Sequence, residues 1–126
     1  KKPYLSKKER IKLSKEITEK ERKISVKYID DKVKSSSTYN LLNYLKKKNS
    51  KKKLYFLMGA DNLKNFHKWK NWKKVPKLAT VVVFARQNYP FKFFSSNISK
   101  KLNRREWVYI NSKKVNISSS LIRKFW

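Results

Sequence analysis

Cysteine is absent from this chain of 126 residues. Disulfide bridges and thiolate metal sites are therefore excluded, and the sequence fits a reducing compartment. The only histidine is His67, which excludes a metal site built from several histidines. No apolar run approaches the roughly 20 residues that span a bilayer, and the first residues lack the apolar stretch of a secretion signal. We therefore expect a soluble, cytoplasmic protein without a membrane-spanning segment.

Acidic residues are few, with eight Asp and Glu against 35 Lys and Arg, and the formal net charge is +27. Most of them lie between Glu9 and Asp31, so that only Asp61 and Glu106 remain in the rest of the chain. A hydrolase site made of paired carboxylates is therefore poorly supported. A Ser-His-Asp site is poorly supported too, because no nucleophile turn is evident.

The excess of positive charge has two interpretations. Lys and Arg neutralise phosphates, so a basic chain can bind nucleic acid without reading its sequence. Here 29 Lys and 6 Arg are spread along the whole chain, whereas it is Arg that provides bidentate recognition. Lys, Asn, Ile, Phe and Tyr are all abundant, which fits the codon drift of a genome rich in A and T. We favour codon drift, with non-specific nucleic-acid binding as the alternative.

Length and apolar content indicate one folded domain, residues 1–126. With 39% hydrophobic and 14% aromatic residues, a chain of this size can bury a core of its own. Helical and β patterns alternate at short intervals along it. This alternation predicts an α/β fold, in which a parallel sheet with right-handed crossovers is flanked by helices. The strand order does not follow from the pattern.

The boundaries of the expected elements follow from hydrophobic periodicity and capping signals. Ser6 and Glu9 form a capping-box pair, which predicts a helix from Ser6 to Glu21. Apolar or β-branched runs predict strands, at residues 24–29, 54–58, 80–85 and 107–110. Further helices are expected after the polar turn 35–38, at 72–75 with Pro76 interrupting or ending it, and from 116 onward. Residues 87–103 show weak periodicity and are expected to be irregular.

The stretch 54–69 holds the most information about a binding site. Its five successive apolar residues, 54–58, predict a strand that is covered on both faces. The only glycine of the chain, Gly59, follows, and glycine lets the backbone approach a ligand closely or take a positive φ. In parallel sheets ligands bind beyond the carboxyl ends of the strands, where Asp61 can accept hydrogen bonds from ribose hydroxyls. Asp61 can also cap a helix that begins at Asn62.

Other side chains have both a structural and a functional interpretation. For His67 we favour a packed residue of the surface or the core over a direct chemical role, although an imidazole can change its charge near neutral pH. Trp69 can stack on a flat ring or fill the core, and its flanking lysines favour a ligand-facing ring, whereas we place Trp72 in the core. Residues 118–120 and Arg123 offer hydroxyls, helix-start amides and a guanidinium. They can cradle a triphosphate or simply cap a helix.

Two long motifs resemble those of the bacterial nicotinate-nucleotide adenylyltransferases. The first is G-A-D-N-L at 59–63, followed by F-H-K-W at 66–69 and by Trp72. The second, I-S-S-S-L-I-R at 117–123, looks like the I-S-S-T-x-I-R signature of the nucleotidyltransferase superfamily, with Ser120 in place of Thr.

Two weaker likenesses extend the resemblance over nearly the whole chain. The segment S-S-T-Y-N-L-L at 36–42 is similar to S-Y-T-x-D-T-L, with Asn40 where Asp is usual. The segment V-F-A-R-Q-N-Y at 83–89 looks like V-F-P-R-P-G-Y. All four segments stand in the order that the family has, which makes the resemblance specific.

The resemblance implies a Rossmann-like nucleotidyltransferase fold and a step of NAD biosynthesis. AMP would pass from ATP to nicotinate mononucleotide, giving deamido-NAD and pyrophosphate, with Mg²⁺ on the phosphates. The implied chemistry is in-line attack on the α-phosphorus, catalysed mainly by positioning and charge neutralisation. The implied contacts to nicotinate mononucleotide are Thr38, Trp69 and Lys70. The implied contacts to ATP are Gly59, Asp61, Arg86, Ser119, Ser120 and Arg123.

One motif of the family is not found in this sequence. The phosphate-binding G-x-F-x-P-x-H-x-G-H, which the family carries on its first strand and the following helix, needs more glycines and histidines than the one of each present. We therefore name no catalytic residue. We favour an excerpt of the enzyme, without its first strand and its C-terminal end, over a decayed form. These 126 residues alone are expected to be poorly stable and inactive. The alternatives are a basic nucleic-acid-binding module and an inactive remnant.

Overall fold

The computed structural model describes residues 4–33, 35–86, 103 and 106–111. The chain divides into two compact units, Lys1–Ser36 and Ser37–Trp126. Each unit has its own elements, and that both belong to one domain stays a prediction. In the described part of the chain, no helix is long and apolar enough to cross a membrane.

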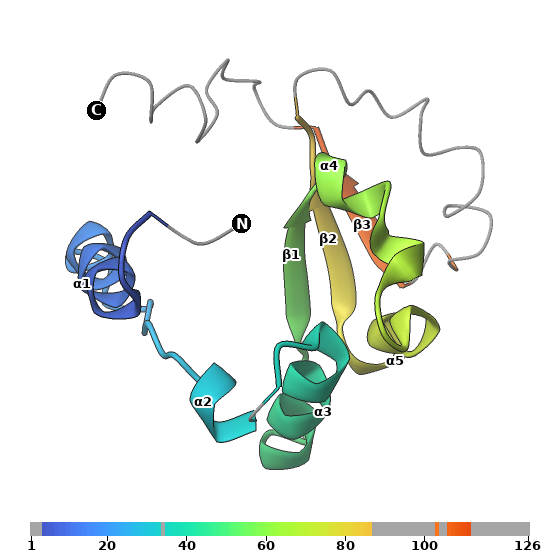
Figure 1. The fold of residues 1–126 in the computed structure, drawn as a ribbon, viewed down its shortest axis with the longest axis horizontal. Coiled ribbons are helices and arrows are strands. Elements are labelled where there is room, and N and C mark those ends of the chain that lie inside the picture. The colour runs from blue at the N-terminus through green and yellow to red at the C-terminus, as the bar shows by residue number, and fades with distance from the viewer. Residues whose placement is uncertain (1–3, 34, 87–102, 104–105, 112–126) are drawn as a thin grey trace. The chain divides into compact units, whose positions relative to one another are not determined.

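The second unit is built on a parallel sheet of three strands. These are β1 (Tyr55–Gly59), β2 (Thr80–Phe84) and β3 (Trp107–Ile110), in the order β1-β2-β3. Figure 1 shows them side by side, with helices next to them. Both strand pairs are parallel, so the predicted α/β fold with a parallel sheet is confirmed. The strands expected at 54–58, 80–85 and 107–110 are confirmed as well.

One face of the sheet carries the core. Val81 and Val83 in the central strand are fully buried, and Met58 beside Val83 is 6% exposed. β-branched residues suit this position because their stiff side chains pack well on a pleated surface. The buried residues of this core come from the strands and from the helices that follow and precede β1: Leu42, Met58, Ala60, Leu63, Phe66, Val75, Ala79, Val81 and Val83.

The connection between β1 and β2 consists of four short helical pieces. These are α4 (Ala60–Leu63), η1 (Phe66–Lys68), η2 (Trp72–Lys74) and α5 (Val75–Leu78). The short helix expected at 72–75 is thus a 3-10 turn followed by α5. Pro76 does not end a helix but lies in the first turn of α5, where its missing N–H leaves no helical hydrogen bond unmade. The helix expected after the polar turn is α3 (Thr38–Lys48), which buries Leu42.

The other face of the sheet is largely exposed, contrary to the prediction for residues 54–58, although Val82 in the central strand is only 7% exposed there. Tyr55 is 60% and Leu57 61% exposed, and their side chains alternate with those of Phe56 and Met58. The same face continues across β2 and β3, where the exposed apolar residues are Phe84, Val108 and Ile110. The described residues of the core cluster pack on the opposite face only. We call this surface of Tyr55, Leu57, Phe84, Val108 and Ile110 the open face.

The first unit contains α1 (Lys7–Ile17) and α2 (Asp30–Val33). The capping box is confirmed, but α1 ends at Ile17 and not at Glu21. There the Thr18 hydroxyl donates to the carbonyl of Ser14 at 2.9 Å, a side-chain bond that competes with continued helix. The strand predicted at 24–29 is wrong. A strand needs a partner for its backbone groups, and the described part of this unit offers none.

The capping box gives α1 a pH-dependent start. Glu9 Oε2 accepts from the Ser6 N–H at 2.8 Å, and Ser6 Oγ accepts from the Glu9 N–H at 3.3 Å. Hydrogen bonds from the side chain and then the backbone of Ser6 lower the pKa of Glu9 below its ordinary value. A lowered pKa in the folded state means that ionised Glu9 stabilises the helix above its unfolded pKa. This contribution is lost as the pH falls through the lowered pKa.

We therefore expect the first turn of α1 to fray in acid. The measurement is the ¹³Cα chemical shift of residues 7–10 between pH 7 and pH 2. The control is Ser6→Ala, which removes the side-chain partner and should lower the helix content already at neutral pH. An unchanged acid transition in Ser6→Ala would show that the capping box is not its cause.

Candidate functional site

Asp61 and Arg86 meet beyond the carboxyl ends of two neighbouring strands. Gly59 and Phe84 pair at the ends of β1 and β2, so the residues that follow each strand emerge at the same edge of the sheet. Arg86 Nη1 donates to Asp61 Oδ2 at 3.0 Å, across 25 positions of the sequence. This edge is where ligands bind in parallel sheets.

The second carboxylate oxygen of Asp61 does not take part in the contact with Arg86. Asp61 Oδ1 is buried and has no hydrogen-bond partner in the described part of the protein. An unpaired buried acceptor costs about 1–3 kcal/mol. The ion pair does not offset this cost, because the side chains of Arg86 and Asp61 are 61% and 30% exposed and such pairs contribute about 0–1 kcal/mol. The arrangement therefore suits a ligand that brings a hydrogen-bond donor.

The position of Asp61 rules out its structural alternative. Helix α4 begins at Ala60 with Gly59 as N-cap, so Asp61 lies inside the first turn and does not cap a helix beginning at Asn62. A carboxylate there still interacts favourably with the helix dipole. Its Oδ1 is buried and has no hydrogen-bond partner among the described residues.

Gly59 has an ordinary extended backbone, with φ −79° and ψ 154°. The sequence offered two reasons for a glycine here, a positive φ and close approach of a ligand. The prediction of a positive φ is wrong. The space beside the Gly59 Cα, where another residue would carry its Cβ, is crowded. A Cβ at this position would lie 2.5 Å from Asp61 Oδ1 and 3.2 Å from Arg86 Nε.

The two tryptophans of the connection pack edge-on against the same phenylalanine. Trp69 lies 5.4 Å from Phe66 and 6.0 Å from Phe56 between ring centroids, and Trp72 lies 5.9 Å from Phe66. Both rings are partly buried and border the core. This packing agrees with the core role predicted for Trp72. The ring of Trp69 is half-buried, which leaves part of it accessible to a ligand.

The remaining predicted residues lie on separate elements. Thr38 is the first residue of α3 and is half-buried, Lys70 is exposed in the turn after Trp69, and His67 is exposed on η1. The structure thus brings together three predicted ATP contacts, Gly59, Asp61 and Arg86. The other three, Ser119, Ser120 and Arg123, lie outside the described residues, as does the helix expected from 116 onward.

Metal ligands do not gather in the described part of the chain. Residues 4–33, 35–86, 103 and 106–111 hold no group of three His, Cys, Asp or Glu that could bind a metal ion. Mg²⁺ commonly keeps several waters and binds through one or two carboxylates together with substrate phosphates. The donor set seen here therefore fits a metal that arrives on a nucleotide better than one held by the protein alone.

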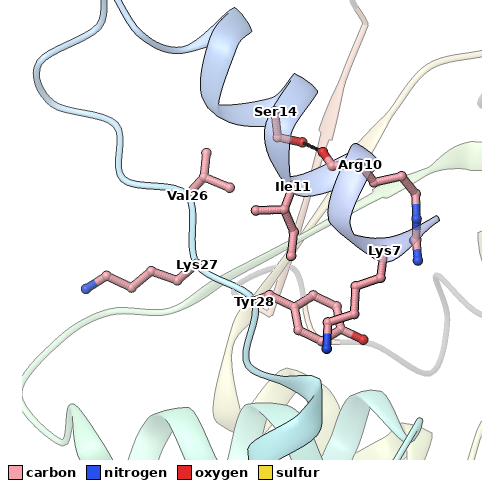
Figure 2. Close-up of a pocket in the computed structure, with 7 residues that line it drawn as sticks. All are labelled: Lys7, Arg10, Ile11, Ser14, Val26, Lys27 and Tyr28. Atoms are coloured by element: carbon pink, nitrogen blue, oxygen red, sulfur yellow. Dashed lines mark hydrogen bonds between the residues drawn. The ribbon is translucent and has the colours of Figure 1, made fainter. Parts of the chain in front are cut away.

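A pocket of about 230 Å³ lies in the first unit, between α1 and the residues before α2 (Figure 2). Two of its polar side chains, those of Lys7 and Ser14, already have partners. Lys7 pairs with Asp31 and sits 4.3 Å from the ring centroid of Tyr28, and Ser14 donates to the carbonyl of Arg10 at 2.8 Å. The remaining lining residues are Ile11, Val26 and Lys27. None of the predicted site residues lies there, and we assign no ligand to it.

Comparison with known proteins supports a single assignment. The family model described as cytidylyltransferase-like matches residues 1–125. A probable nicotinate-nucleotide adenylyltransferase of Pelagibacter ubique is 48% identical over 117 residues, covering 93% of this chain and 64% of its own length. The protein of that name from Aliarcobacter butzleri is 31% identical, with 95% of this chain and 60% of its own length covered. The resemblance seen in the motifs is confirmed.

A solved structure shows the same fold. It is the Plasmodium falciparum nicotinic acid mononucleotide adenylyltransferase complexed with APC, which is 23% identical and superposes with a TM-score of 0.76. The alignment covers 95% of this chain and 62% of that one. The predicted Rossmann-like nucleotidyltransferase fold is confirmed. The chain spans about 56–64% of the length of the first three curated relatives it matches.

Proposed function

The chain belongs to the cytidylyltransferase-like family, and from this premise we propose that the protein carrying it is a nicotinate-nucleotide adenylyltransferase. It would transfer AMP from ATP to nicotinate mononucleotide and release pyrophosphate, a step of NAD biosynthesis. The names of the relatives support this substrate pair.

The observation that carries the proposal is the free oxygen of Asp61. A carboxylate at the carboxyl end of β1, tied on one side to Arg86, keeps its other oxygen without a partner in the described part of the chain. Ribose hydroxyls are hydrogen-bond donors of the kind that acidic residues accept in nucleotide sites. We assign Gly59, Asp61 and Arg86 to the side of the site that binds ATP.

The nicotinate side of the proposed site is the turn after η1. Trp69 keeps a partly accessible ring for stacking on nicotinate, since its edge contacts to Phe56 and Phe66 hold it in place. Backbone near Thr38 and Lys70 would hold the nicotinate carboxylate. Ser119, Ser120 and Arg123 would take the ATP phosphates.

Catalysis of this reaction would depend more on aligning the two substrates than on an acid, base or nucleophile of the protein. An oxygen of the mononucleotide phosphate attacks the α-phosphorus of ATP, the bond from that phosphorus to the bridging oxygen of the β-phosphate breaks, and pyrophosphate leaves with the electron pair. Mg²⁺ on the triphosphate would neutralise the developing charge. The residues of this chain would align the two substrates in line, and Arg123 would contribute positive charge at the phosphates.

The direct test is pyrophosphate release by the protein that carries this chain. We expect release with ATP and nicotinate mononucleotide, measured by a coupled phosphate assay, and a comparison with nicotinamide mononucleotide defines the preference. No release with either mononucleotide would contradict the proposal. Binding to oligonucleotides that survives physiological salt and requires Trp69 would instead favour the basic nucleic-acid-binding module.

A further inference from the structure

The only glycine of the chain stands where the backbone does not require one. Gly59 has φ −79° and ψ 154°, an extended conformation that any residue adopts. Its amide and carbonyl belong to the last position of β1, opposite Phe84. The reason for the glycine must therefore lie in the space around its Cα.

That space is filled by the two side chains of the site. A Cβ on residue 59 would come within 2.5 Å of Asp61 Oδ1, closer than any ordinary contact, and within 3.2 Å of Arg86 Nε. Both neighbours are ends of side chains. The strand and the core could therefore keep their places if these side chains moved away, and most of the cost of a larger residue would fall on Asp61, with a smaller part on Arg86.

Asp61 has little freedom to move without consequence. Its Oδ2 is held by Arg86 at 3.0 Å, and its Oδ1 occupies the place next to the Cα of Gly59. Rotating the Asp61 carboxylate away from residue 59 would break the hydrogen bond to Arg86 or change the direction in which Oδ1 points. The two oxygens are thus fixed by two different neighbours.

We infer that Gly59 and Arg86 are positioning residues for Asp61, and that the glycine serves the carboxylate instead of close approach of a ligand to the backbone. Arg86 holds one oxygen, and the missing side chain at 59 leaves room for the other beside its Cα. The expected donor to that oxygen is a ribose hydroxyl of the nucleotide. This identity of the ligand rests on the proposed function, whereas the coupling of the three residues does not.

The first experiment tests the coupling without any ligand. The ¹³C resonance of the Asp61 carboxyl carbon is compared in the unmodified protein, Gly59→Ala, Arg86→Gln and Arg86→Lys. We expect Gly59→Ala and Arg86→Gln to shift it clearly and Arg86→Lys to shift it less. Lys64→Ala, a change at an exposed position after α4, is the control. An Asp61 resonance that stays in place in Gly59→Ala would overturn the inference.

The second experiment is a double-mutant cycle read out as the KM for ATP. Loss of a hydrogen bond to a charged group corresponds to about tenfold or more, so Gly59→Ala and Asp61→Ala should each raise KM by about tenfold. The double variant should be no worse than Asp61→Ala, because the new methyl group then meets no carboxylate. Multiplying effects, about 100-fold in the double variant, would mean that the methyl group blocks the ligand itself and would overturn the inference.

The two experiments separate two kinds of failure. If the unmodified protein releases no pyrophosphate, the proposed function fails, and the carboxyl resonance still decides whether Gly59 and Arg86 position Asp61. If it is active and Gly59→Ala leaves both the resonance and KM unchanged, the proposed function stands and the inference fails.

Discussion

Leu63→Ala is expected to lower the free energy of unfolding by about 2–5 kcal/mol. Leu63, the last residue of α4, is 1% exposed and belongs to the core cluster. Truncation removes buried apolar atoms and leaves a cavity that Phe66 and Val75, both fully buried, cannot easily fill. The measurement is urea unfolding followed by tryptophan fluorescence.

The chain provides a matched control for this substitution. Leu57, six residues earlier, is 61% exposed on the open face, so the same change from Leu to Ala should cost about 1 kcal/mol or less. Equal losses in the two variants would show that Leu57 is covered in the folded protein. A small loss in Leu63→Ala would contradict the core described above.

Trp69→Ala is expected to reduce kcat/KM for nicotinate mononucleotide about 10- to 100-fold. Stacking of a ring on an aromatic side chain contributes about 1–3 kcal/mol, and each 1.4 kcal/mol corresponds to a factor of about ten. Trp69→Phe keeps an aromatic face and should retain most of the activity. The measurement is initial rates of pyrophosphate release at varied mononucleotide and saturating ATP.

Trp72→Ala separates stacking from packing. Trp72 contacts the same ring of Phe66 at a similar centroid distance, 5.9 Å against 5.4 Å for Trp69, and we expect it to have only a core role. Both alanine variants should lose stability, but only Trp69→Ala should raise KM for the mononucleotide while both are folded. A similar rise in the two variants would argue that Trp69 acts through packing alone.

The sheet was predictable because each of its strands is a compact apolar run. Residues 80–84 are β-branched or aromatic and lie in the central strand, so pattern and position agree. Residues 24–29 have a similar pattern and form no strand. A sequence pattern reports what a segment can do, whereas a strand also needs a neighbour for its backbone groups.

Residues 54–58 show a second limit of the pattern. Five successive apolar residues predict burial on both faces, yet Tyr55 and Leu57 are exposed while Met58 is buried. Hydrophobicity reports the preference of a side chain for burial and not the presence of a covering element. The open face could be identified only from the packing.

The site was predictable residue by residue but not as an assembly. Asp61 follows from its place after a strand and Arg86 from its motif, but their contact depends on β1 and β2 being neighbours, and the strand order did not follow from the sequence. The role inferred for Gly59 could be predicted from the sequence even less. It depends on where a carboxylate oxygen lies in space, 2.5 Å from an absent Cβ.

In solution, apolar attraction through the open face acts against the electrostatic repulsion between copies of the chain. Exposed Tyr55, Leu57 and Val108 favour contact between molecules, while a net charge of +27 on every copy keeps them apart. At 0.1 M salt, the repulsion between charges more than about 10 Å apart is largely screened. The apolar attraction remains. Ionic strength, the variable that would weaken any electrostatic binding of nucleic acid, therefore also controls the colloidal behaviour of this chain.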